Sequence, residues 1–295
     1  MSYATLTARL PAWTRVLDAE AYEAFMAIVR DALQSFGEAF DLQDDHVRFK
    51  RWELPLLPLA QECAPSPREL WPSRVRALLE QRGAEEKLGR ELDAVRGDFS
   101  KARTILKLRV QNKLSANAIA APIAAGLHAV LVLDLPSFVT PVRPADLASW
   151  ERPAAELVAL ALENVKAQEH VELKPLEVAG ARIFAVSGTS FFVATLGLAA
   201  EDLLGAPSRF GALVAMPSSH ILLCHSIASK SSLKALDAMA TVALQAFESG
   251  PQPLSPDLLW KVGDKFIALP VRRENGEIKC DLPREFDEQV VSQLS

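Results

Sequence analysis

The sequence predicts an α+β protein in which a largely antiparallel sheet is flanked by helices. Hydrophobic residues make up 49% of the 295 residues, and 13 Gly and 19 Pro are scattered along the chain, so folding by burial of an apolar core is expected. Long uncharged windows are divided by clusters of turn residues, which is typical of paired strands. The segments beside these windows repeat apolar residues every three or four positions, which predicts amphipathic helices.

Three uncharged windows, residues 114–133, 183–200 and 210–229, come close to the roughly 20 residues that a membrane-spanning helix needs. Each window is interrupted by residues that suit a turn better than a membrane span. The second contains Gly-Thr-Ser at 188–190, and the third contains Pro-Ser-Ser at 217–219. We therefore expect buried strands that bend at these clusters, and no membrane span.

The C-terminal half has the clearest pattern, and residues 153–250 predict the order α-β-β-β-α-β-β-α. The predicted helices are residues 153–167, 199–204 and 231–247, and the predicted strands are 171–178, 182–187, 191–196, 212–216 and 221–227. Strands over 258–262, 265–271 and 277–281 follow, with turns at Gly-Asp and Asn-Gly pairs between them.

The N-terminal half predicts a helix and a hairpin before a less regular part. The expected elements are a helix over 19–35, a hairpin over 39–52, a proline-rich loop over 53–67 and helices over 68–82 and 85–95. We divide the chain into an N-terminal α+β region, residues 1–113, and a C-terminal α+β domain, residues 126–295.

The net charge and the cysteines indicate which cellular compartment and which kinds of partner suit this protein. The net charge is −5, which repels phosphate backbones, so nucleic-acid binding is not expected. The odd number of cysteines, Cys63, Cys224 and Cys280, has no Cys-x-x-Cys pair and suits a reducing compartment. Residues 1–15 have no secretory signal pattern, so a cytoplasmic location is expected.

No motif predicts a catalytic dyad, a metal or a cofactor. Cys224 and His225 are consecutive in a predicted strand, so their side chains should point to opposite faces and cannot form a dyad. Asp44, Asp45 and His46 have no second cluster to complete a metal site, and a solvated hairpin tip is the better interpretation. The sequence has no P-loop and no G-x-G-x-x-G pattern, so we predict no cofactor.

Five basic residues lie between positions 101 and 113 with no acidic residue among them: Lys101, Arg103, Lys107, Arg109 and Lys113. Such a stretch can bind phosphates or the acidic surface of a protein partner. It lacks interleaved aromatic residues that would stack on bases. Its alternation with Leu106, Leu108 and Val110 equally describes a half-exposed edge strand that is protected by charge. Both interpretations are open at this point.

One stretch carries a family resemblance. An aspartate ends the apolar strand at 129–134, a tryptophan follows, and a helix then carries Glu-Leu and an asparagine two turns later; these positions are Asp134, Trp150, Glu156 and Asn164. Together with residues 100–111 and 212–218, this pattern resembles the YtpQ-like family of bacterial proteins of unknown function, over about residues 40–250. The chain departs from the family in the alanine-rich segment 115–125 and in its acidic tail.

The YtpQ-like resemblance implies a cytoplasmic bacterial protein and supplies no catalytic residues. Separately, the order of elements in residues 153–250 is similar to the fold of type III secretion chaperones, in which a sheet face and its helices bind a partner chain. This second similarity concerns topology only.

We expect a non-catalytic protein-binding module, either chaperone-like or an adaptor, because no nucleophile, base and oxyanion set converges in the sequence. The alternative is an enzyme with a site assembled from distant residues around Asp134 and His220, together with Asn164 and Ser219. A carboxylate at a strand end suits acid-base chemistry, although aspartate also favours turns. The oligomeric state is left open.

Overall fold

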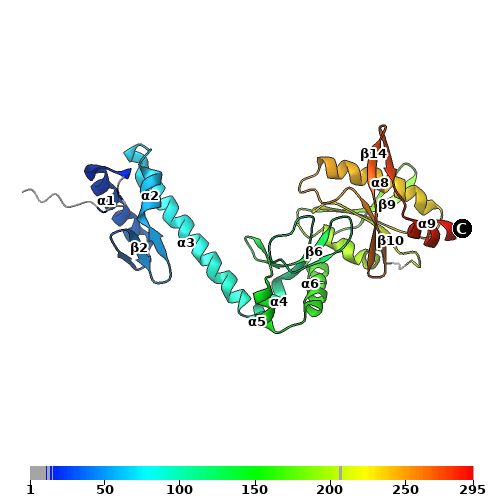
Figure 1. Cartoon of the computed structure of the whole chain (residues 1–295), viewed down its shortest axis with the longest axis horizontal. Helices are drawn as coiled ribbons and strands as arrows, with labels where there is room; N and C mark the ends of the chain where they lie inside the picture. The colour runs from blue at the N-terminus through cyan, green and yellow to red at the C-terminus, as the bar shows by residue number, and fades with distance from the viewer. Residues whose placement is uncertain (1–10, 12–13, 15, 206–207, 295) are drawn as a thin grey trace, which may run out of the picture. The chain divides into compact units, whose positions relative to one another are not determined.

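The structure is a computed structural model that describes residues 11, 14, 16–205 and 208–294. It confirms the predicted α+β class, because helices flank antiparallel sheets (Figure 1). Contacts divide the chain into two compact units, Met1–Ala94 and Val95–Ser295, which we call the first and the second unit. We expected the division between residues 113 and 126. Residues 106–111 instead pair with residues 128–134 in one sheet, which ties residues 95–113 to the second unit.

The first unit begins with the predicted helix, α1 (Ala19–Phe36). The side chain of Asp18 caps its first turn by accepting a hydrogen bond of 2.7 Å from the amide of Ala21. The helix ends where Gly37 takes a φ of 82°, a conformation that favours glycine. The elements that follow are β1 (Phe40–Leu42), β2 (His46–Phe49), β3 (Glu53–Pro55), α2 (Leu56–Cys63), the 3₁₀ helix η2 (Arg68–Leu70) and α3 (Trp71–Arg96).

One apolar core holds the first unit together. It joins the inner face of α1, the sheet β1-β2-β3, α2 and the first turns of α3. Phe25 of α1 meets Trp71 of α3 edge to face, with ring centroids 6.3 Å apart. Phe49 and Trp52 stack with centroids 4.0 Å apart at the end of the β-hairpin.

The proline-rich loop expected over residues 53–67 is wrong, because this segment contains β3 and α2. The prolines lie where a missing amide costs little: Pro55 precedes α2, and Pro58 is in its first turn. The helical signal was present in the spacing of the buried residues, which are Leu56, Leu59, Ala60 and Cys63.

The two helices expected over 68–82 and 85–95 are one helix, α3. Gly83 does not end it, since a glycine inside a helix weakens the helix by only about 1 kcal/mol. The absence of a side chain at Gly83 has a packing reason: a Cβ atom there would lie 2.7 Å from Cζ of Phe36. The ring of Phe36 therefore packs directly on the backbone of α3.

The second unit is built on two sheets. The six-stranded antiparallel sheet has the order β13-β12-β10-β11-β9-β8, and its strands are β8 (Lys174–Val178), β9 (Ala181–Ser187), β10 (Ala212–Ser218), β11 (Ile221–Ser226), β12 (Leu258–Val262) and β13 (Lys265–Leu269). The smaller sheet has the order β4-β6-β5 with β7 also on β6, and its strands are β4 (Leu106–Gln111), β5 (Ala120–Pro122), β6 (His128–Asp134) and β7 (Val139–Pro141). The hairpin predicted at the cluster 217–219 is confirmed, with residues 217 and 218 still in β10 and the turn at Ser219 and His220 joining β10 to β11.

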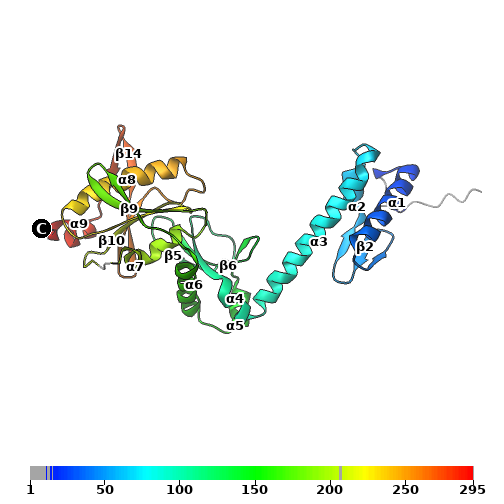
Figure 2. The same ribbon diagram turned by 180° about the vertical axis from the view of Figure 1, so that it is seen from behind.

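Both faces of the six-stranded sheet are covered. The helix α8 (Ser231–Ser249) packs on one face, with the hairpin β14 (Val271–Glu274) and β15 (Glu277–Cys280) beside it. On the other face lie the 3₁₀ helix η3 (Ala194–Ala199), α7 (Ala200–Leu204) and the smaller sheet. The remaining helices are α4 (Phe99–Ile105), α5 (Pro144–Trp150), α6 (Ala154–Gln168), α9 (Arg284–Gln289) and η4 (Val291–Gln293); α6 packs against β4 (Figure 2).

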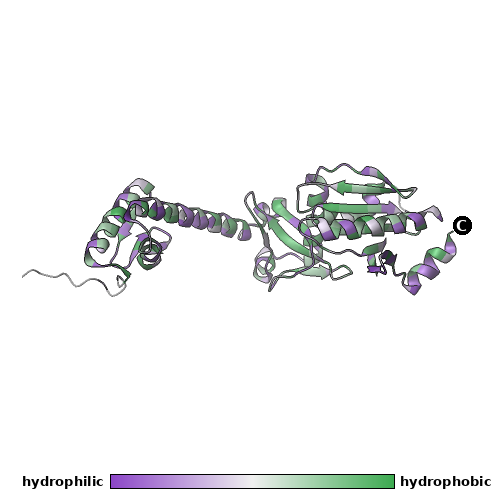
Figure 3. Ribbon diagram, turned by 90° about the horizontal axis from the view of Figure 1, so that it is seen from above, coloured by the Kyte–Doolittle hydropathy of each residue, from purple (hydrophilic) through white to green (hydrophobic). Residues whose placement is uncertain are grey.

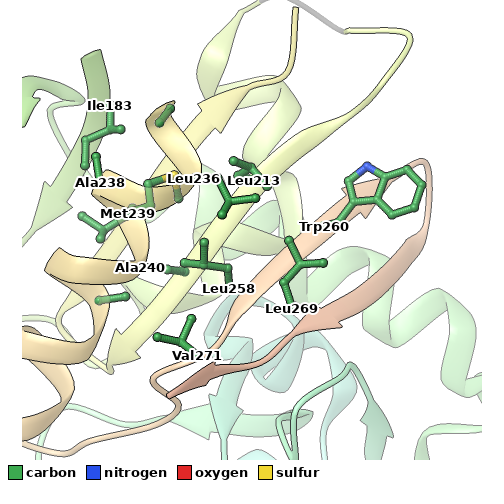
Figure 4. Close-up of a cluster of buried hydrophobic side chains, with 14 of the residues drawn as sticks. Ile183, Leu213, Leu236, Ala238, Met239, Ala240, Leu258, Trp260, Leu269 and Val271 are labelled. Carbon is green, nitrogen blue, oxygen red and sulfur yellow. The ribbon is translucent and has the colours of Figure 1, made fainter. Parts of the chain in front are cut away.

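Two apolar cores result, one on each face of the large sheet. Met239 and Ala240 of α8 belong to the first core together with Leu213 and Leu258 of the sheet, as Figure 4 shows. Val214, the neighbour of Leu213, belongs to the second core, because successive side chains of a strand point to opposite faces. Every residue of β10 is buried for this reason.

The third strand expected within 153–250, residues 191–196, is wrong. This segment forms a turn followed by η3, so the observed order is α6, β8, β9, η3, α7, β10, β11, α8. Residues 192–197 are buried without a break, and in a short apolar run of this kind the residue pattern does not distinguish a tight helix from a fully buried strand. Gly197 permits close packing, since a Cβ there would lie 2.8 Å from Cε of Met216.

The strands of the second unit are mostly apolar, whereas α3 carries many hydrophilic residues (Figure 3). The uncharged windows 114–133 and 210–229 contain strands, and 183–200 contains most of β9 and all of η3. In the part of the chain that is described, none of the helices combines the length and the apolar character that crossing a membrane requires.

Replacing Trp260 with alanine is expected to lower the free energy of unfolding of the second unit by about 3–5 kcal/mol. The Trp260 side chain is 1% exposed, donates a 2.8 Å hydrogen bond to the carbonyl of Phe210 and meets the Phe286 ring at 5.2 Å. Unfolding in guanidinium chloride, followed by far-ultraviolet circular dichroism, measures the loss. Leu282→Ala, at a 40% exposed site, is the control and should cost under about 1 kcal/mol; equal losses in the two variants would contradict this account of the core.

Candidate functional site

The basic stretch predicted from sequence lies on α4, β4 and the residues that follow β4. β4 is an edge strand of its sheet, but its charged face is not open to solvent. Lys107 lies opposite Val132 of β6 and Arg109 lies opposite Val130, and cross-strand partners share a face. Both valines belong to the core between the two sheets. The face that carries the two cations is therefore turned toward the interior of the second unit.

Lys107 is an internal ion-pair centre. Its side chain is 6% exposed, and its Nζ atom lies 2.9 Å from a carboxylate oxygen of Asp134 and 2.9 Å from one of Glu169. The same atom is 4.5 Å from the centroid of the Phe192 ring. Burial lowers the pKa of Lys107, but the hydrogen bonds and charges of the two carboxylates outweigh burial and raise the pKa overall. This ammonium is fully engaged and is not available to a ligand.

The other predicted cations differ from Lys107 in their surroundings. Lys101 is exposed and pairs with Asp98 at 3.4 Å. Arg103 is exposed, and its backbone carbonyl accepts a hydrogen bond of 2.7 Å from Asn164. Arg109 and Lys113 are the two predicted cations that line a cleft. The structure thus separates the five basic residues into different roles and does not gather them in one patch.

The Arg109 guanidinium is partly buried and lacks a counter-charge. It lies 5.0 Å from the centroid of the Phe191 ring, and its Nη2 atom donates a hydrogen bond of 3.4 Å to the side-chain oxygen of Gln252. Its Nε atom is buried and, within the described residues, makes no hydrogen bond. Among those same residues, no carboxylate forms an ion pair with it. Burial lowers the pKa of Arg109.

Arg109 opens onto a cleft of about 500 Å³ at the junction of the two sheets. The described residues that line it include no Asp, Glu, His or Cys; they are Arg109, Val110, Gln111, Asn112, Lys113, Ser219, Gln252, Pro253 and Leu254. Lys113 is exposed and, in the part of the chain that is described, forms no ion pair. The cleft therefore carries two positive charges and several hydrogen-bond donors without an opposing negative charge.

Hydrogen bonds between distant segments hold the walls of this cleft. The amide nitrogen of the Asn112 side chain donates to the carbonyls of Pro253 and Leu254, at 3.1 and 2.9 Å. The backbone amide of Ser219 donates to the carbonyl of Gln252 at 3.2 Å. The end of β4, the β10–β11 turn and the segment 252–254 are thereby fixed to one another. A cleft with cross-linked walls is preformed for a ligand.

An aromatic residue extends the cleft at its rim. Phe191 is 38% exposed and lies between the Arg109 guanidinium and the His220 ring, whose centroid is 5.2 Å from its own. His220 is oriented by a contact of 3.1 Å between its Nδ1 atom and the carbonyl of Ser190. Leu114, next to Lys113, is 48% exposed. Apolar surface therefore adjoins the charged cleft.

The residues that carry the family resemblance make structural contacts. The Trp150 indole donates a 2.8 Å hydrogen bond to the carbonyl of Arg96, and Glu156 is exposed and pairs with Arg152 at 3.4 Å. The Asn164 side chain donates to the carbonyls of Arg103 and Leu106, which fastens α6 to the α4–β4 junction. Asp134 pairs with Lys107. Ser219 lines the Arg109 cleft, but the described residues of that lining do not include Asp134, Asn164 or His220. The cleft therefore brings together only one of the four residues named for the alternative enzyme site.

Cys224 and His225 point to opposite faces of β11, as the sequence predicted. Cys224 belongs to the core between the sheets, where burial raises the pKa of its thiol to about 12. On the other side, the His225 ring contacts the carbonyl of Arg182 at 3.0 Å through Nδ1 and the Ser232 hydroxyl at 3.1 Å through Nε2. Burial lowers the pKa of His225, which favours its neutral form. The two groups do not form a dyad.

Asp44, Asp45 and His46, interpreted from the sequence as a hairpin tip, lie between β1 and the start of β2. His46 Nδ1 lies 2.7 Å from a carboxylate oxygen of Asp45. Within the described ranges, no group of three or more His, Cys, Asp or Glu side chains is placed to hold a metal ion.

Sequence reasoning missed Asn112 and Gln252, which complete the cleft. Gln252 is 143 positions from Arg109, the residue that it contacts, so no local pattern could connect them. The sequence matches no family model, and comparisons with curated proteins and with solved structures also gave no match. The resemblance to the YtpQ-like family therefore stays a prediction.

Replacing Lys107 with methionine is expected to destabilise the second unit by about 3 kcal/mol, the lower end of the range for breaking a buried ion pair, because Asp134 is partly exposed. The raised pKa of Lys107 makes its contribution complete at neutral pH and lost only as the pH rises above the ordinary lysine range. Unfolding at several pH values measures both effects. Lys101→Met, which breaks an exposed pair, is the control and should change stability by under about 0.5 kcal/mol. A similar small change for both variants would show that the Lys107 ion pairs do not stabilise the fold.

The thiols of Cys224 and Cys280 are expected to react with a disulfide reagent at pH 8 roughly a thousandfold more slowly than an exposed thiol, because burial raises both pKa values to about 12 and little thiolate is present. Labelling followed by mass spectrometry of peptides measures each rate. Ala116→Cys, at an exposed position, supplies the matched exposed thiol. Rapid labelling of Cys224 in the folded protein would show that β11 does not bury it.

Proposed function

We propose that this chain is a non-catalytic protein-binding module of the adaptor or chaperone-like type, and that its cleft between β4 and the β10–β11 turn binds an acidic segment of a partner polypeptide. The observation that carries the proposal is the partly buried Arg109 guanidinium, whose Nε atom has no hydrogen-bond partner within the described residues, in a cleft without acidic lining. The proposal includes a bacterial cytoplasmic setting, with which the three free cysteines are compatible.

The argument rests on the cost of removing a charge from water. A partly buried cation without a partner destabilises the fold, and proteins normally compensate it with a carboxylate. The second unit follows this rule elsewhere: Lys107 is paired with Asp134 and Glu169, and Lys261 with Glu201 at 3.1 Å. Arg109 departs from the rule. A carboxylate brought by a ligand would supply the missing charge and two acceptors that suit a guanidinium.

The surroundings of the cleft favour a polypeptide as the source of the carboxylate. Phe191 and Leu114 offer exposed apolar surface beside the cations, and an acidic peptide segment combines carboxylates with apolar side chains. A nucleic acid suits the site less well. The net charge of −5 repels a polyphosphate, and Lys107, which a phosphate-binding stretch would use, is already paired.

Binding of a fluorescein-labelled hexapeptide that alternates glutamate with phenylalanine tests the proposal. We expect saturable binding to the full chain, weakened about tenfold or more by Arg109→Gln, since a hydrogen-bonded ion pair contributes about 1.5–3 kcal/mol. Lys113→Gln should weaken binding only a few-fold, because its ammonium is exposed. Arg103→Gln is the matched control in the same basic stretch and should leave binding unchanged. Fluorescence anisotropy at low and high salt measures each affinity.

Three results would overturn the proposal. One is equal loss of binding in the Arg109 and Arg103 variants. Another is equal binding of a peptide in which glutamine replaces glutamate. The third is no saturable binding up to about 1 mM peptide, which corresponds to a binding free energy of only about −4 kcal/mol. Circular dichroism of each variant confirms that the fold is retained.

A further inference from the structure

The first unit has a groove of its own, built by β3, α2 and α3. The groove consists of two adjoining hollows of about 430 and 370 Å³, which share Pro55 and Arg82. Leu54, Pro55, Pro58, Leu59, Gln61, Glu62, Leu78 and Arg82 line the first hollow, and Trp52, Glu53, Pro55, Arg82, Glu85 and Glu86 line the second. None of these residues takes part in the cleft of Arg109.

The first hollow is apolar at its base. Leu54 and Leu59 are 5% and 2% exposed, and they belong to the core of the first unit. Leu78 of α3 is half-buried and lies against the same core. Pro58 completes the wall. A volume of this size accepts one or two apolar side chains.

The second hollow combines an aromatic ring with negative charge. Trp52 is held in place by its stacking on Phe49, with the two planes 6° apart. Glu53, Glu85 and Glu86 line the hollow against a single cation, Arg82, which pairs with Glu85 at 3.1 Å. Glu53 pairs with Arg48 at 3.1 Å. In the described part of the chain, Glu86 forms no ion pair, so the hollow keeps an excess of negative charge.

We propose that this groove binds a segment of a partner polypeptide in which an apolar side chain is followed by arginine or lysine. The apolar side chain enters the hollow at Leu54, Leu59 and Leu78. The cation lies over the Trp52 ring and close to Glu86, where cation–π attraction and opposite charge act together. Charge complementarity identifies the occupant: of the four carboxylates that line the combined groove, Glu53, Glu62 and Glu85 pair with Arg48, Arg74 and Arg82, and within the described residues Glu86 keeps an uncompensated negative charge. This selectivity is opposite to that of the Arg109 cleft, so the inference goes beyond the function proposed above.

The probe is a fluorescein-labelled hexapeptide that alternates leucine with arginine, measured by anisotropy against the full chain. Glu86→Lys should weaken binding about tenfold, because it replaces the attracting charge with a repelling one. Glu91→Lys is the matched control. It makes the same change of charge on the same helix at an exposed residue, roughly 140° around the helix axis from the partly buried Glu86. Leu78→Ala should weaken binding about fivefold through lost apolar contact, and circular dichroism shows whether it folds.

Several outcomes separate this proposal from its alternatives. Arg109→Gln should leave binding of the arginine peptide unchanged, so failure of one site is distinguishable from failure of the other. Equal effects of Glu86→Lys and Glu91→Lys would overturn the proposal, and so would equal binding of a peptide that alternates leucine with glutamate. If Glu86→Lys instead changes the mass measured by light scattering without changing peptide affinity, the groove is a contact between copies of this chain, and the proposal is wrong.

Discussion

The second unit depends on one constraint, which is that apolar layers cover both faces of the six-stranded sheet. β10 shows this most strictly, because all its residues are buried and those from Leu213 to Met216 alternate between the two cores. Leu213 packs toward α8, whereas Val214 packs toward η3. A shift of one residue in register would exchange these two sets, so the register of β10 determines which segments cover each face. The smaller sheet is part of the layer that packs on the second face. For this reason the side of β4 that carries Lys107 and Arg109 faces the interior of the second unit.

The two cations of β4, Lys107 and Arg109, differ in how their buried charge is compensated. Lys107 and Arg109 are two positions apart on one face of one strand, and each lies beside an aromatic ring. Lys107 is compensated by two carboxylates, whereas Arg109 meets only the neutral side chain of Gln252. The same sheet therefore contains a fully compensated buried cation and an uncompensated one. The fold therefore can supply carboxylates to a buried cation, and the incomplete pairing of Arg109 is the feature on which the proposed binding of an acidic segment rests.

The sequence could predict those parts of the molecule whose signals are local. The β10–β11 hairpin followed from one turn cluster between two apolar runs, and α1 from the periodicity of its apolar residues. The same reasoning failed at residues 191–196, where a short apolar run is compatible with either a strand or a tight helix and tertiary packing decides between them. It found Arg109 and Lys113 as candidates, but it could not tell them from Lys107. That distinction depends on Glu169, which is 62 positions away along the chain.

The chemistry of the Arg109 cleft is that of an anion-binding site. Acid-base catalysis needs a group that takes up and releases a proton close to the reacting atoms. The described residues that line the Arg109 cleft supply donors and one hydroxyl, that of Ser219, but no carboxylate, imidazole or thiol to activate it. The thiols with the most strongly raised pKa, Cys224 and Cys280, are shifted chiefly by burial and lie outside this lining. Two cations and several hydrogen-bond donors without a proton acceptor among the described lining residues suit the binding of an anion, which is the function proposed above.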